Sequence, residues 1–328
     1  MKTRMENLFV TLAMLSTLLQ PSTASAQGSL TPTGAPAPTM MTLSQIEPRT
    51  PISSAPFVIS TSGSYYLTTN LNVTSGNAIT INANQVTLDL NGFTISSVEA
   101  SPTGVGILLA SPAGSSDITI RNGHITGSVT NNGDIYSGHG FVSGISYTTN
   151  APNNVRVSDV SVSGCLSNGI FLSFASSMVE SCTVQTVGNI GIDADVVSHS
   201  TALSCGLFGI LADAISDSHG ESYGNGSGVY AYGSVNNCYG YSAGSSGIYA
   251  ATANNCYGYS NIGAGVTANI ANNCYGFSFG GGYGIYVSGS AMGCYGQSTS
   301  GVGIYARIAN SCTVGGGTTN ITYKYNMP

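Results

Sequence analysis

Hydrophobic and polar residues alternate along most of the chain, in short runs separated by turn-forming residues. Between residues 78 and 95, Ile79, Ile81, Val86, Leu88 and Leu90 alternate with polar residues, and an Asn-Gly pair follows. A period of two is typical of β-strands, because successive side chains point to opposite faces of a sheet. Asn-Gly, Asn-Asn and Ser-Gly pairs favour turns, since these residues tolerate a positive φ. The pattern predicts an all-β protein built from short strands.

One version of this pattern repeats clearly between residues 236 and 312. Each repeat contains a Cys and, nine or ten residues later, a Gly followed by Ile or Val. The glycines recur at intervals of 18 to 22 residues back to Gly169. A period near 20 without helical patterning is typical of a solenoid, in which each repeat buries its apolar side against its neighbours. We therefore predict a single-domain right-handed parallel β-helix with coils of about 18–20 residues.

The cysteines form one column of the predicted coils. Counting nine residues back from each glycine adds Ser200 and His219 to this inward-facing column. Side chains of one column point the same way on coils about 4.8 Å apart, which is poor geometry for disulfides. We predict a ladder of buried free thiols with no metal site, and we expect Cys165 and Cys205 to point inward outside it. The ladder comprises Cys182, Cys238, Cys256, Cys274, Cys294 and Cys312.

Tyrosines form further columns. Tyr230, Tyr249, Tyr286 and Tyr305 each lie two residues after a column glycine, and alternation turns them outward. A second set directly follows ladder positions. Exposed tyrosine rows are a candidate glycan-binding surface, because sugar rings pack their CH faces on aromatic rings. The alternative is that they cover the sheet, since Tyr suits strands. The second set is Tyr239, Tyr257, Tyr275 and Tyr295.

Three acidic residues are the candidate catalytic group. Asp195 and Asp213 each lie four residues after a column glycine, so we expect both to project outward on adjacent coils, about 4.8 Å apart. Asp193 lies two residues before Asp195 on the same predicted surface. Two carboxylates about 5 to 9 Å apart are what glycoside hydrolysis requires. The same three residues are also candidates for Ca²⁺ binding, or for a solvated surface with no ligand.

Composition narrows the choice of partners and location. The chain has 328 residues, a net charge of −6 and 6% charged residues, so it offers no basic patch for nucleic acid. Residues 1–26 have the charged start, short apolar run and Ala-Ser-Ala ending of a secretory signal peptide. We expect a flexible leader at 27–42 and a β-helix with an N-terminal cap at 43–328. The protein is then exported, secreted or periplasmic, without an integral membrane segment after cleavage.

Several segments carry a family resemblance. The runs GSYYLTTNLNV at 63–73, VTLDLNGFTI at 86–95 and ITIRNGHI at 118–125, the Cys-to-Gly-Ile coils and the KYNM ending at 324–327 resemble exported bacterial β-helix proteins of the pectate-lyase-like superfamily. The branch that it resembles carries no assigned activity, and fold does not transfer chemistry. We interpret the protein as structural or glycan-binding at the cell envelope or outside the cell. The alternative is a polysaccharide-cleaving enzyme, a hydrolase rather than a lyase, using the Asp cluster.

Overall fold

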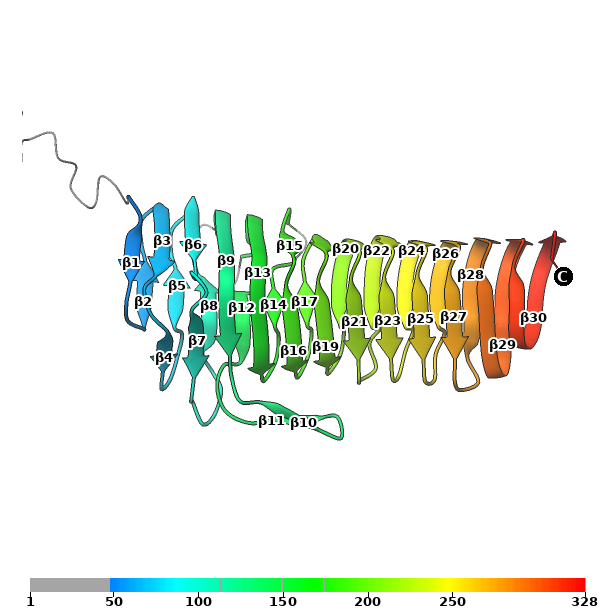
Figure 1. Cartoon of the computed structure of the whole chain (residues 1–328), viewed down its shortest axis with the longest axis horizontal. Coiled ribbons are helices and arrows are strands. Elements are labelled where there is room, and N and C mark those ends of the chain that lie inside the picture. Colours follow the sequence, from blue (N-terminus) through cyan, green and yellow to red (C-terminus); the bar gives the residue numbers. More distant parts are fainter. Residues whose placement is uncertain (1–47, 112–113, 149, 174, 328) are drawn as a thin grey trace, which may run out of the picture. The chain divides into compact units, whose positions relative to one another are not determined.

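A computed structural model describes residues 48–327 except 112–113, 149 and 174. The predicted signal peptide (1–26), the leader (27–42) and the start of the predicted cap therefore lie outside the described residues. The described chain contains strands and no helix, and its strands stack in parallel register as a β-solenoid of about 14 turns (Figure 1). The predicted all-β parallel β-helix is confirmed.

Each coil has three faces, and each strand pairs with the equivalent strand one coil away (Figure 1). The first face contains β2 (Phe57–Ile59), β5 (Ile79–Ile81), β8 (Val105–Leu109), β12 (Ser143–Tyr147), β14 (Ile170–Phe171) and β17 (Ile192–Asp193). The second face contains β1 (Thr50–Ile52), β3 (Gly63–Leu67), β6 (Val86–Asp89), β15 (Met178–Glu180) and β18 (Val196–Ser198).

The third face contains β4 (Leu71–Val73), β7 (Thr94–Ser97), β16 (Thr183–Val187), β19 (Thr201–Cys205), β21 (His219–Ser222), β23 (Tyr239–Ser242), β25 (Tyr257–Ser260) and β27 (Tyr275–Ser278). Other strands bend through more than one face. The second and third faces share β9 (Ser116–Thr126) and β13 (Asn153–Cys165). The first and second share β20 (Ile210–Ser216), β22 (Val229–Asn236), β24 (Ile248–Asn254), β26 (Val266–Asn272) and β28 (Tyr283–Met292). All three are crossed by β29 (Tyr295–Asn310) and β30 (Thr313–Tyr325).

The core is a stack of inward columns that continue from coil to coil. On the first face, the residue after each column glycine is fully buried, as alternation predicts. Burying a Val or Ile side chain contributes about 1.5 to 3 kcal/mol, so the column stabilises each coil only where a neighbour covers it. The column runs through Ile145, Ile170, Ile192, Ile210, Val229, Ile248, Val266, Ile285 and Ile304.

Two columns of glycine face each other across this core. A Cβ placed on Gly258 of the third face would overlap the carbonyl oxygen of Gly265, and one placed on Gly247 would lie 2.5 Å from the nitrogen of Tyr259. Both distances are far below van der Waals contact, so the two walls touch through their backbones. The recurrent Gly-Ile pair is therefore a packing requirement of the coil.

The corner between the second and third faces has a left-handed backbone on successive coils. Asn237, Asn255 and Asn273 have φ of 53°, 52° and 52°. Asn tolerates this region better than most residues, which explains the Asn-Asn pairs of the repeat. The Asn255 side-chain amide also donates to Asn237 Oδ1 at 3.3 Å, and Asn254 donates to Asn236 Oδ1 at 2.8 Å. These stacked amides hold neighbouring corners in register.

The stretch at 127–142 leaves the solenoid, and it forms an antiparallel hairpin of β10 (Thr130–Asn132) and β11 (Ile135–Ser137) (Figure 1). Tyr136 packs on the coils that contain Gly188 and Gly206, where any added Cβ would lie 3.1 Å from its side chain. Burial raises the pKa of Tyr136 to about 12. The hairpin therefore packs over the turns of two later coils.

Candidate functional site

The tyrosines of the first face stand in one column and stack on each other. Tyr230 and Tyr249 have ring centroids 4.6 Å apart with planes 7° from parallel, and Tyr286 and Tyr305 are 4.8 Å apart at 11°. The strand register places Thr267 between these two pairs. Rings stacked in this way cover each other's faces and turn their edges outward. A ring face is therefore open only where the column is interrupted or ends.

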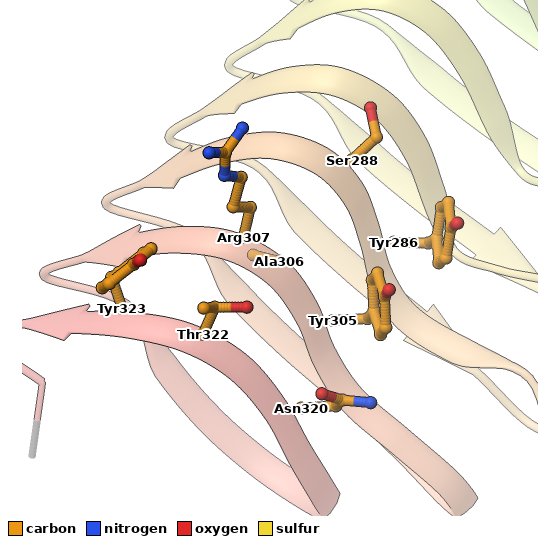
Figure 2. Close-up of a pocket in the computed structure, with 8 residues that line it drawn as sticks. All are labelled: Tyr286, Ser288, Tyr305, Ala306, Arg307, Asn320, Thr322 and Tyr323. Carbon is orange, nitrogen blue, oxygen red and sulfur yellow. The ribbon is translucent and has the colours of Figure 1, made fainter.

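Such an ending lies beside Tyr305. The next position in its column is Asn320 on β30, and a cavity of about 440 Å³ lies along this part of the first and second faces. Figure 2 shows Tyr286 and Tyr305 side by side on consecutive strands, with Asn320 continuing their row on the next strand. Arg307 lies two residues after Tyr305 on the same strand, β29. The cavity lining comprises Tyr286, Ser288, Tyr305, Ala306, Arg307, Asn320, Thr322 and Tyr323.

Arg307 gives this cavity its positive charge. In contrast, Arg49 and Arg121 at the other end of the solenoid lie 3.6 and 3.1 Å from Asp89, which is buried. Among the described residues no carboxylate forms an ion pair with Arg307. An exposed guanidinium can take a carboxylate or sulfate group in a two-point contact. The glycine spacing ends before β30, so the sequence pattern did not place Asn320 next to Tyr305 or reveal a cavity beside Arg307.

The third face carries two more aromatic rows. The predicted set Tyr239, Tyr257, Tyr275 and Tyr295 stacks continuously, with centroid distances of 5.2, 4.7 and 4.9 Å. A parallel row stands two residues further along each strand. Both rows are outward and stack without a break, so neighbouring rings cover each other's faces except at the row ends, where Thr313 follows Tyr295 and Gln297 follows Phe277 in register. The second row comprises Tyr241, Tyr259 and Phe277, and the ring of Tyr223, which follows β21, lies 5.6 Å from that of Tyr241.

All eight cysteines are free and buried in the structure, as predicted. Each thiol of the ladder donates to the carbonyl oxygen two residues earlier, for example Cys256 Sγ to Asn254 O at 3.0 Å and Cys274 Sγ to Asn272 O at 3.3 Å. Burial raises the pKa of Cys182 and Cys238 to about 12, so these thiols stay protonated at neutral pH. Outside the ladder, Cys205 belongs to a second inward column.

One residue predicted in the inward-facing column, His219, does not lie there. The inward residue between Ser200 and Cys238 is Ser218, whose hydroxyl accepts from the Ser200 nitrogen at 3.1 Å. His219 instead pairs in register with Tyr239 on the outer side of the third face, and its ring lies 4.5 Å from the Tyr239 ring. The turn before Gly228 is one residue longer than in most neighbouring coils, so counting nine residues back reaches the wrong position.

The structure separates the three candidate acids by burial. Asp213 is exposed and its backbone nitrogen donates to Asp195 O at 2.9 Å, so these two lie on adjacent coils as predicted. Asp193 was expected on the open surface, but it is 5% exposed, in register between Phe171 and Leu211. Its Oδ1 has no hydrogen-bond partner, and burial raises the pKa of Asp193 to about 6.

The geometry gives no support to a Ca²⁺ site at these acids. In the described part of the chain, no three His, Cys, Asp or Glu side chains are grouped so that they could hold a metal ion.

No helix in the described ranges is long and apolar enough to cross a membrane.

The comparisons with known proteins identify no family for this chain. No family model matches the chain, and no curated protein sequence matches it. Among solved structures, the A-module of a mannuronan C-5 epimerase from Azotobacter vinelandii is similar, with a TM-score of 0.45 and 14% sequence identity over 81% of this chain and 88% of that one. This likeness is too distant to carry a residue role across, and the resemblance to the pectate-lyase-like superfamily stays a prediction.

Proposed function

We propose that this protein is a polysaccharide-binding β-solenoid, and that it binds a glycan in the cavity beside Tyr305. The observation that supports the proposal most directly is one cavity that combines the end of the Tyr305 stack with the Arg307 guanidinium and neutral hydrogen-bonding groups. Among the described residues, Arg307 has no carboxylate partner. Tyr305 offers an apolar surface to a sugar ring, and Arg307 can hold an acidic substituent. Asn320 and Thr322 supply donors and acceptors for hydroxyl groups.

The cavity has groups that can hold a sugar but no carboxylate pair of the kind that glycoside hydrolysis uses. None of the residues that line it is a His, Cys, Asp or Glu, so its groups for proton transfer are tyrosines. We also propose that the protein acts outside the cytoplasm, at the cell envelope or beyond it, because residues 1–26 have the pattern of a secretory signal peptide.

Titration calorimetry with a neutral oligosaccharide, cellohexaose, and with an oligogalacturonate of equal length tests the proposal. We expect Tyr305→Ala to weaken binding of the preferred ligand about threefold to tenfold, the size of one stacking contact. Arg307→Gln should weaken only the acidic ligand, by tenfold or more. Tyr257→Ala, in the third-face row, is the matched control and should leave binding unchanged. Equal affinities in the wild type, Tyr305→Ala and Arg307→Gln would contradict the proposed site.

A polysaccharide hydrolase remains the second candidate, supported by the raised pKa of Asp193 beside the adjacent acids Asp195 and Asp213. A carboxyl group with a pKa of about 6 can act as a general acid near neutral pH. Against it, the burial of Asp193 keeps its carboxyl away from a surface-bound sugar. If the protein cleaves polysaccharide with Asp193 as the acid and the adjacent carboxylates as its partners, Asp213→Asn should abolish release of reducing ends. Cleavage that persists in this variant would remove the hydrolase mechanism.

A further inference from the structure

One threonine interrupts the tyrosine column of the first face. Thr267 pairs in register with Tyr249 on one side and with Tyr286 on the other. Adjacent parallel strands lie about 4.8 Å apart, so these two tyrosines stand about 9.6 Å apart, twice the normal step of the stack. On both flanks the column stacks at 4.6 and 4.8 Å with nearly parallel planes. The interruption therefore leaves a gap that one ring would fill.

The two walls of the gap are ring faces, unlike the outward edges elsewhere in the column. Tyr249 is covered by Tyr230 on its other side, and Tyr286 by Tyr305, so each offers one free face toward Thr267. Tyr249 is 40% exposed, which shows that solvent reaches this part of the column. A ring inserted here would contact an aromatic face on both sides.

The floor and rim of the gap carry neutral hydrogen-bonding groups. Thr267 Oγ1 lies 2.8 Å from Ser246 Oγ. Two residues further along β26, Asn269 Oδ1 accepts from Ser288 Oγ at 2.9 Å. The nearest positive side chain of the cavity, Arg307, stands two coils from Thr267, about 9.6 Å along the axis. The gap therefore favours a ring with apolar faces, a hydroxylated rim and no charge, which is the chemistry of a neutral pyranose.

We propose that the gap at Thr267 is a subsite for one neutral pyranose ring, sandwiched between Tyr249 and Tyr286. The inference rests on the proposed function, because it adds a second position for the same glycan. Thr267, Tyr286, Tyr305 and Asn320 occupy successive coils of one column, so Thr267 and Asn320 are about 14 Å apart along the axis, and Tyr286 borders both the gap and the cavity. A glycan chain that follows the column reaches both.

Thr267→Tyr tests the proposal because it fills the gap with the ring that the column lacks. We expect the variant to stay folded and to bind cellohexaose roughly tenfold more weakly or worse, since the ligand loses two aromatic faces. Thr201→Tyr is the matched control: it adds the same ring at an outward position of the third face and should bind like the wild type. If Thr267→Tyr does not fold, Tyr249→Leu removes one wall and should weaken binding in the same direction.

A second readout reports the sandwich itself. In the NMR spectrum of cellohexaose, the CH protons of one bound sugar unit should shift upfield from the ring currents of two faces, and this shift should vanish in Thr267→Tyr. If Thr267→Tyr binds like the wild type while Tyr305→Ala weakens binding, the gap subsite is refuted and the cavity stands. If Thr267→Tyr weakens binding while Tyr305→Ala binds like the wild type, the gap subsite is supported and the cavity proposal is wrong. Failure of the wild type to bind either oligosaccharide refutes both, and displacement of cellohexaose by equimolar phenol would show that the gap takes planar aromatic rings instead.

Discussion

Replacing Asp193 by Leu should stabilise the protein at neutral pH and remove one component of its pH dependence. Asp193 lies in register between Phe171 and Leu211, so a leucine continues an existing apolar row and is close to aspartate in the length of its side chain. The carboxyl is 5% exposed and one of its oxygens has no partner. Burying an ionised carboxylate under these conditions is costly, which is why burial raises the pKa of Asp193 to about 6.

The magnitude follows from proton linkage. The folded pKa of Asp193 is about 6, against about 3.9 for an unfolded aspartate. The folded state therefore prefers the protonated form: the stabilising contribution is complete below about pH 3.9 and is lost as the pH rises through about 6. A difference of two pKa units corresponds to about 3 kcal/mol of unfolding free energy. The unfolded carboxyl is already half ionised near pH 4, so the advantage of Asp193→Leu over the wild type should grow by about 2.4 kcal/mol between pH 4 and pH 7.5.

Urea unfolding followed by far-UV circular dichroism measures this difference at each pH. Other carboxylates titrate in the same range, and the hydrogen bond from Thr103 together with backbone donors lowers the pKa of Glu99, which acts in the opposite direction. Subtracting wild type from variant at each pH removes these contributions. Asp213→Leu, at an exposed position, controls for the loss of one negative charge. An advantage of Asp193→Leu that stays constant from pH 4 to pH 7.5 would refute the reasoning.

Two further predictions test the packing of the coil. Gly258→Ala should destabilise by more than about 3 kcal/mol, because its Cβ overlaps the Gly265 carbonyl oxygen, whereas Gly281→Ala, whose nearest contact would be 3.8 Å away, should stay within about 0.5 kcal/mol in the same urea assay. Similar losses in both variants would contradict the backbone contact. Cys256→Ser should cost less than about 1.5 kcal/mol, because a hydroxyl there can donate to Asn254 O as Ser200 donates to Ser198 O at 2.8 Å. Thiol titration of the unfolded wild type should find eight free thiols, and recovered disulfides would contradict the ladder.

The coil and its inward columns could be predicted because one local rule repeats. The period of two decides which side chains point into the core and which point outward. The Gly-Ile pair recurs where two faces of the coil touch through their backbones, and Asn occupies the corner where the backbone has a positive φ. The rule failed where one turn gained a residue, so His219 was assigned to the position that Ser218 occupies. A fixed count from glycine carries no information about turn length. Matching the His-Gly-Glu-Ser run to Tyr-Gly-Tyr-Ser on the next coil would have found the correct register.

The candidate sites were harder to predict from the sequence, because the exposure of a residue depends on which neighbouring segments cover it. Alternation places Asp193 and Tyr249 on the same outer side of the first face, yet one is buried and the other is 40% exposed. The segment after β14 contributes to the lower exposure of Asp193, because the backbone of Ser173 in this segment donates a hydrogen bond to the Asp193 carboxyl group. No periodic pattern specifies such a segment. Likewise, the cavity at Arg307 depends on β30, which lies beyond the last Gly-Ile pair.

Stacked aromatic columns also limit where a solenoid can bind sugar rings. A parallel coil repeats its side chains about every 4.8 Å, which is close to the distance at which rings stack on each other. In a complete tyrosine column, neighbouring rings therefore cover each other's faces, as those of Tyr239, Tyr257, Tyr275 and Tyr295 do. Such a column stabilises the sheet and presents only edges to a ligand. Because a sugar needs a face, recognition by stacking requires that the repeat be broken. The first face breaks it at Thr267 and again at Asn320. The departures from the repeat are thus the positions that distinguish a binding surface from a covering one.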